Sequence, residues 1–151
     1  MLCWPCADMP CPLVPDINVW GVTVQYVVTA IRKTGATSQY ILLPGTEYTS
    51  AMGFVSDGSA AALINVTNLD NSTTNLIFDV HQYLDSDGSG THTDCVTDHV
   101  ADAFSPLATY LRQNKRMAIL SEIGSGSNDS SCLTGMDYPS LLSQFLQTAS
   151  H

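Results

Sequence analysis

The stretch NLIFDVHQYLDSDGS, residues Asn75–Ser89, decides the fold. It begins as an apolar run that continues through Val80, and then becomes polar, acidic and rich in glycine. A short apolar run bounded by turn residues is typical of a strand buried on both faces, as in parallel sheets. Asp79, His81 and Tyr83 come at the C-terminal end of this predicted strand, which is where parallel α/β folds place ligands and chemistry.

A second stretch repeats this layout. MAILSEIGSG, residues Met117–Gly126, is an apolar run followed by an acid, Glu122, and a glycine-rich loop.

Helices and strands alternate along the predicted chain. Apolar spacing and capping residues predict helices at Asp16–Lys33, within Ser50–Val66 (most clearly Ser59–Ile64), at Thr97–Asn114 and at Pro139–Gln147. Short apolar runs predict strands at Gln39–Leu43, Asn75–Tyr83 and Arg116–Ser121. Alternation at this spacing indicates parallel strands joined by crossover helices. Periodicity leaves open whether they form an open doubly wound sheet or an arc of a (β/α)8 barrel.

Size and charge narrow the functional classes. A chain of 151 residues is one domain or part of a larger one. The net charge of −9, with five lysines and arginines, argues against nucleic acid and anionic membranes as partners. No apolar run approaches the roughly 18 residues that a membrane helix needs.

The cysteines and glycosylation sequons favour an oxidising, secretory setting. Three cysteines crowd the N-terminus and two stand apart in the body: Cys3, Cys6, Cys11, Cys95 and Cys132. Sequons begin at Asn65, Asn71 and Asn128. The N-terminal sequence has no basic region followed by a continuous apolar one, so it contains no recognisable signal peptide. Its three thiols do not complete a metal site, and we interpret residues 1–13 as an unrelated, disordered leader.

The chain has only two glutamates, Glu47 and Glu122. Two carboxylates flanking a bond are the requirement for glycoside hydrolysis. Glu122 is the better candidate because a strand end holds it rigidly, whereas Glu47 lies in a loop; the alternative is that both are solvated loop acids. His81 and Tyr83 share one side of their strand and could bind a sugar hydroxyl or a carboxylate. The alternative for His81 is a hydrogen-bonded core histidine.

The sequence predicts no metal and no cofactor. The run from Asp85 to Gly90 resembles the start of a calcium loop, but its twelfth position is Val96, not glutamate, which excludes an EF-hand. His92, Cys95 and His99 lack a fourth ligand at suitable spacing. Phosphate-binding and nucleophile-elbow motifs do not occur.

At these residues the sequence resembles fungal endo-β-1,4-glucanases of glycoside hydrolase family 5. The resemblance rests on IFDVHQYLDSDGSGTHTDC and FSPLATYLRQNKRMAILSEIG, and it runs from about Val14 to near Ser150. That family folds as a (β/α)8 TIM barrel and cleaves β-1,4-glucan internally with retention of configuration. The resemblance implies that residues 14–150 are the C-terminal portion of such a catalytic domain. They would form about strands five to seven with their helices.

The resemblance also implies roles for particular residues. Glu122 matches the nucleophile, and His81 and Tyr83 match a His-x-Tyr pair that lines the cleft beside it. Tyr48 stands where relatives carry Trp or Tyr, so it would offer a sugar-stacking face. Cys95 and Cys132 match a pair that is disulfide-bonded in relatives.

The departures from the family pattern are as informative as the matches to it. No Asn-Glu-Pro motif, which carries the acid/base in the family, precedes Pro15, and Glu47 does not match that position. Strands one to four and the eighth are missing, so we expect a truncated product of a secreted parent. Such a chain would be catalytically silent, bind β-glucan weakly through Tyr48 and Tyr83, and self-associate through uncovered edges. A lesser alternative is another β-glycanase of the family, such as a mannanase.

Overall fold

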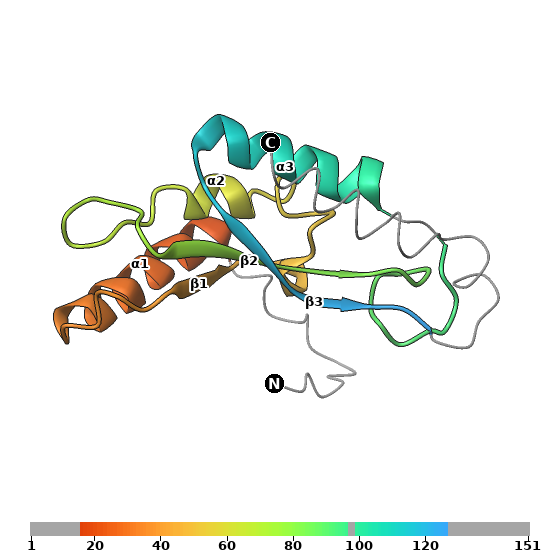
Figure 1. The fold of residues 1–151 in the computed structure, drawn as a ribbon, viewed down its shortest axis with the longest axis horizontal. Helices are drawn as coiled ribbons and strands as arrows, with labels where there is room; N and C mark the ends of the chain where they lie inside the picture. The colour runs from red at the N-terminus through yellow and green to blue at the C-terminus, as the bar shows by residue number, and fades with distance from the viewer. Residues whose placement is uncertain (1–15, 97–98, 127–151) are drawn as a thin grey trace.

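The computed structural model describes residues 16–96 and 99–126. Its helices are α1 (Ile17–Lys33), α2 (Ser59–Leu63) and α3 (Ser105–Asn114), with a 3₁₀ turn η1 (Glu47–Thr49) and a π turn η2 (Val100–Phe104). The strands are β1 (Ile41–Pro44), β2 (Leu76–Tyr83) and β3 (Ala118–Gly124). They form a parallel sheet in which β2 lies between β1 and β3 (Figure 1). Within the described residues no helix is long and apolar enough to cross a membrane.

The sequence signals at the ends of α1 are confirmed. The Asp16 carboxylate accepts a hydrogen bond from the Asn18 backbone N–H at 2.9 Å, as an N-cap does. Beyond the other end, Gly35 has φ of 88° and its N–H donates to the Arg32 carbonyl at 3.1 Å, which closes the helix. The helix is tied to the sheet because the Trp20 indole N–H donates to the Pro44 carbonyl at 2.7 Å.

The core lies on the helix-covered face of the sheet. Every second residue of β2 is buried there, and one of them, Phe78, is fully buried against Phe54 with ring centroids 5.4 Å apart. Leu63 of α2 and Leu107 of α3 belong to the same cluster. Burying these apolar side chains supplies most of the driving force for the fold, at about 25 cal/mol per Å².

The expectation that both faces of β2 are buried is wrong. Ile77, Asp79, His81 and Tyr83 face the other side of the sheet and are only partly buried. No element of the described part of the chain covers this face, which explains their exposure. This second face is therefore the open face of the sheet.

Several element boundaries differ from the expected ones. β3 continues to Gly124, three residues past the predicted end, so Glu122 lies inside a strand. α3 begins at Ser105, with Pro106 in its first turn, and the residues before it form the π turn. The predicted segments Met1–Leu13 and Pro139–Gln147 lie outside the described residues.

Candidate active site

The polar residues at the end of β2 share the open face, as the sequence predicts. Asp79, His81 and Tyr83 occupy alternate positions on it. They come at the C-terminal edge of a parallel sheet, where such sheets place their chemistry.

A β-bulge brings Glu122 to the same face. Val80 pairs with Leu120, but the next residue of β2, His81, pairs with Glu122, so Ser121 is an extra residue in β3. An extra residue bends its strand and re-aims the side chains around it. Glu122 is thereby placed beside His81.

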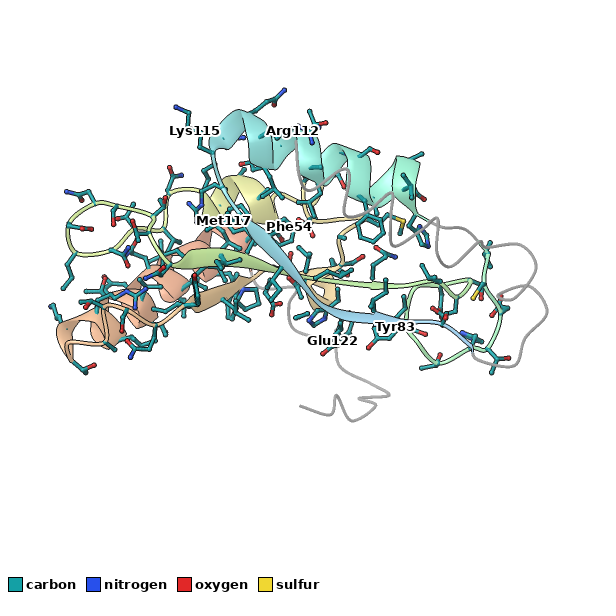
Figure 2. All side chains as sticks on the ribbon, viewed as in Figure 1. Phe54, Tyr83, Arg112, Lys115, Met117 and Glu122 are labelled. Atoms are coloured by element: carbon teal, nitrogen blue, oxygen red, sulfur yellow. The ribbon has the colours of Figure 1, made fainter. Side chains whose placement is uncertain are left out.

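Two side chains of β2 contact the Glu122 carboxylate. The Tyr83 hydroxyl donates a hydrogen bond to Glu122 Oε2 at 2.8 Å, and His81 Nδ1 lies 3.5 Å from the same oxygen. The hydrogen bond to Glu122 raises the pKa of Tyr83 above its usual value. Figure 2 shows Tyr83 and Glu122 on adjacent strands. The carboxylate is held from one side and half exposed on the other, with a side-chain exposure of 52%.

Two glycines make room for the Tyr83 ring. A Cβ at Gly90 would lie 2.6 Å from the nearest ring carbon, and one at Gly124 would lie 2.8 Å from it. Side-chain atoms do not approach this closely, so both positions require glycine while the ring stays in place.

A left-handed turn carries Tyr48. Glu47, Tyr48 and Thr49 have φ of 49°, 55° and 56°, a conformation that non-glycine residues rarely adopt. The Thr49 hydroxyl accepts from the Gly45 N–H at 2.9 Å and donates to the Asp79 carbonyl. It therefore bridges β1 and β2 where β1 ends. Tyr48 projects from this turn with 90% of its surface exposed.

These residues line one cleft of about 850 Å³. Its walls come from the η1 turn, the end of β2, the loop after β2 and β3; they include Glu47, Tyr48, Asp79, His81, Tyr83, Asp87, Ser89 and Glu122. The structure thus brings all four predicted catalytic and sugar-binding residues together, and Glu47 with them. A groove of about 420 Å³ between α3 and β3 has no carboxylate in its lining, so the acid chemistry belongs to the larger cleft.

The loop after β2 is organised by a buried carboxylate. Asp85, only 3% exposed, accepts backbone hydrogen bonds from Gly90 and His92, each at 3.1 Å. His92 Nδ1 also lies 3.4 Å from a carboxylate oxygen of each of Asp85 and Asp87. His99 Nδ1 lies 3.1 Å from Asp102 Oδ2.

Cys95 takes part in a disulfide. Its predicted partner, Cys132, lies outside the described residues, so their pairing stays a prediction.

The Asp85 carboxylate gives the loop a defined pH dependence. Burial alone would raise its pKa, but the His92 and Gly90 N–H groups outweigh this and lower the pKa from 3.8 to about 2. A lowered pKa means that the stabilisation is full above pH 3.8 and is lost as pH falls through about 2. We expect Asp85→Asn to lower the melting temperature at pH 7, with the difference from the parent chain shrinking between about pH 4 and 2. A pH-independent difference in thermal melts would contradict this account.

Sequence reasoning did not assign site roles to Ser121 and Thr49, nor one to Asp79 beyond its place at the strand end. Asp79 could have been added because it alternates with His81 and Tyr83. Ser121 depends on the bulge, and Thr49 on a turn of three left-handed residues without glycine; neither has a local sequence signal.

Comparisons with known proteins show which family the chain resembles. The model of the cellulase family, glycosyl hydrolase family 5, matches residues 4–148. Endoglucanase EG-II of Hypocrea jecorina is 65% identical over 121 residues, which are 80% of this chain and 29% of that protein. A manganese dependent endoglucanase, Eg5A of Phanerodontia chrysosporium, is 49% identical over 120 residues. These residues are 79% of this chain and 30% of the length of Eg5A. The chain therefore spans about a third of the length of these relatives.

A solved structure shows the same likeness in three dimensions. Cel5A (EG2) of Hypocrea jecorina superposes with a TM-score of 0.79 at 59% identity, covering 89% of this chain and 40% of that one. The sheet of three parallel strands with its helices corresponds to a partial barrel, as the resemblance implies.

Proposed function

Because the chain belongs to the cellulase family, glycosyl hydrolase family 5, we propose that it forms part of a retaining glycoside hydrolase. Its substrate would be cellulose or a related β-glucan, cleaved at internal β-1,4-glucosidic bonds. The observation that carries this proposal is the Glu122 carboxylate in the cleft, hydrogen-bonded by Tyr83 and contacted by His81.

Each residue has a role in this mechanism. One Glu122 oxygen attacks the anomeric carbon and forms a glycosyl-enzyme, which water then hydrolyses. Tyr83 and His81 hold the other side of the carboxylate, so that it enters the reaction already oriented. Tyr48 offers an exposed ring at the cleft wall, against which a sugar face stacks. A second carboxyl group must protonate the leaving oxygen in this chemistry.

A substrate with an activated leaving group tests Glu122 without that second carboxyl group. The dinitrophenyl glycoside of cellotriose, with fluorine replacing the hydroxyl next to the anomeric carbon, releases dinitrophenolate without needing a proton. Glu122 then forms a bond to the anomeric carbon, and the fluorine slows its hydrolysis. We expect mass spectrometry to find one cellotriosyl group on the Glu122 peptide.

Two matched variants complete the experiment. Glu122→Gln should take up no label, because the amide is a poor nucleophile. Glu47→Gln is the matched control, because it changes the other glutamate of the same cleft. It leaves the proposed nucleophile in place and should be labelled at the parent rate. Labelling of the parent chain at any other residue would refute the role of Glu122.

A second candidate is a chain that binds β-glucan without hydrolysing it. The 90% exposure of Tyr48 in the same cleft as Tyr83 favours it. General acid catalysis is worth about 10²–10⁴-fold, so without an acid in place natural glucan would turn over very slowly. Reducing-end release from carboxymethylcellulose measures turnover, and a Tyr48→Ala variant measures the stacking contribution to binding. Parallel assays on mannan separate the mannanase alternative.

We also propose that the protein acts outside the cell. The disulfide at Cys95 supports this, since disulfides form and persist in oxidising compartments.

The open face of the sheet leads us to expect self-association. Leu42 and Ile119 lie on it with 41% and 43% of their surfaces exposed, next to Ile77. Apolar side chains exposed together favour association. Light scattering should show a molecular mass that rises with concentration, and Leu42→Lys with Ile119→Lys should lower it. Replacing the exposed Val22 of α1 by Lys is the control, and a monomeric parent chain would contradict the expectation.

A further inference from the structure

The extra residue in β3 decides which way Glu122 points. In an uninterrupted register His81 would pair with Ser121, and Glu122 would pair with Gln82. The Gln82 side chain is 2% exposed on the helix-covered face of the sheet. A slip of one residue moves a side chain to the opposite face. Without the bulge, Glu122 would therefore turn away from the cleft.

The bulge has a specific anchor across the strands. The Ser121 hydroxyl donates to Asp79 Oδ1 at 2.5 Å. This contact joins the residue that is extra in β3 to a carboxylate on the open face of β2. Hydrogen bonds to carboxylates are short and about twice as strong as those between neutral groups.

Asp79 has two further contacts, one through its backbone and one through its side chain. Its carbonyl accepts the Thr49 hydroxyl, which ties it to the end of β1, and its second oxygen, Oδ2, lies 3.9 Å from His81 Nε2. His81 in turn lies 3.5 Å from the Glu122 carboxylate. The Thr49 bond anchors the backbone from which the Asp79 carboxylate reaches Ser121.

We propose that Asp79 is a positioning residue that holds the β3 bulge through Ser121 and thereby sets the position of the Glu122 carboxylate. It does not touch substrate in this role. Its significance for catalysis rests on the proposed function, in which Glu122 is the nucleophile.

The test uses two readouts on the full chain. The first is the rate of cellotriosyl labelling of Glu122 as a function of reagent concentration. The second is the pKa of the Tyr83 hydroxyl, followed by NMR of ring-labelled tyrosine, because the hydrogen bond to Glu122 raises it. The second readout reports where the carboxylate lies and needs no reaction.

Removing either end of the contact should have the same consequence. In Ser121→Ala and in Asp79→Ala we expect labelling at saturating reagent to slow by roughly 10- to 100-fold, as displaced reacting groups do. The reagent concentration at half-saturation should not change, and the Tyr83 pKa should fall back toward its usual value. The double variant should be no slower than the slower single one, since both changes break one bond.

Two further variants separate positioning from general damage. Ser121→Thr keeps the hydroxyl and should retain the parent rate and the raised Tyr83 pKa. Ser38→Ala removes an exposed hydroxyl far along the chain and should change neither. If circular dichroism shows that either alanine variant fails to fold, the other alanine variant, compared with Ser121→Thr, decides the question.

The outcomes distinguish the two proposals. A Ser121→Ala chain that keeps both the parent labelling rate and the raised Tyr83 pKa overturns the positioning role. A parent chain that takes no label, while its Tyr83 pKa still falls on loss of Ser121, refutes Glu122 as nucleophile and supports the positioning role. A parent chain whose Tyr83 pKa is not raised overturns the positioning role. The Glu122 carboxylate would then not lie beside the Tyr83 hydroxyl, where the bulge is proposed to place it.

Discussion

Replacing Phe78 by alanine is expected to lower the free energy of unfolding by about 3–5 kcal/mol, the usual cost of removing a buried phenylalanine. The ring is fully buried at the centre of the sheet, where it contacts Phe54. The Arg116 guanidinium carbon lies 4.5 Å from its centroid, so a cation–π contact is lost as well. Because small domains are stable by only about 5–15 kcal/mol, this loss is a large fraction of the total.

Urea unfolding measures the effect, and Ile77→Ala is its control. Ile77 is the next residue along β2 but lies on the open face, where its side chain is only partly buried. We expect its truncation to cost about 1 kcal/mol, the centre of the range for point mutations. Equal costs for the two variants would mean that the core does not lie on the face that carries Phe78.

The contrast between these neighbours shows where sequence reasoning on β2 failed. Leu76, Ile77 and Phe78 are all apolar, and a continuous apolar run is typical of a strand covered on both sides. Alternate burial is visible only once the fold is known, because Ile77 faces a side that the described chain leaves open. The polar positions that follow were easier, since residues two apart share a face whatever covers it.

Alternation along the chain predicted the order of elements and the parallel sheet, but not the barrel. Periodicity is the same in an open sheet and in an arc of a barrel, so only the resemblance to a family separated them. Helix α1 was predicted almost to the residue because Asp16 and Gly35 signal its two ends. β3 was not, because the prediction ended the strand at Ser121, before the acidic Glu122, whereas the strand continues to Gly124.

The site itself was predictable only in part. Glu122, His81 and Tyr83 lie near the C-terminal ends of two strands that are side by side, so their meeting could be anticipated. The bulge at Ser121 could not, because it depends on a contact with Asp79, 42 residues earlier. The left-handed turn at Tyr48 likewise depends on the Thr49 hydroxyl, which bridges two strands. Long-range contacts of this kind override local preferences.

Replacing Gly124 by alanine is expected to slow the labelling of Glu122 by about 10²-fold, the size of effect seen when one oriented hydrogen-bond donor is lost from a site. The new Cβ would lie 2.8 Å from Tyr83 Cδ1 and Cε1, so the ring must move. The moved ring would take its hydroxyl away from Glu122. Gly124 is not among the positive-φ residues, so alanine fits its backbone conformation and the effect is confined to the ring.

Tyr83→Phe shows whether the effect of Gly124→Ala acts through the hydroxyl. It keeps the ring in place but removes the donor, and it should slow labelling to a similar extent. If both changes break the same hydrogen bond, the double variant should be no slower than the slower single variant, because effects that share a partner do not add. Gly53→Ala is the steric control: the nearest atom to its Cβ would be Asp57 Oδ2, at an ordinary 3.4 Å, and labelling should stay near the parent rate. Additive losses in the double variant would show that Gly124 acts on Glu122 by another route, such as the strand that carries them both.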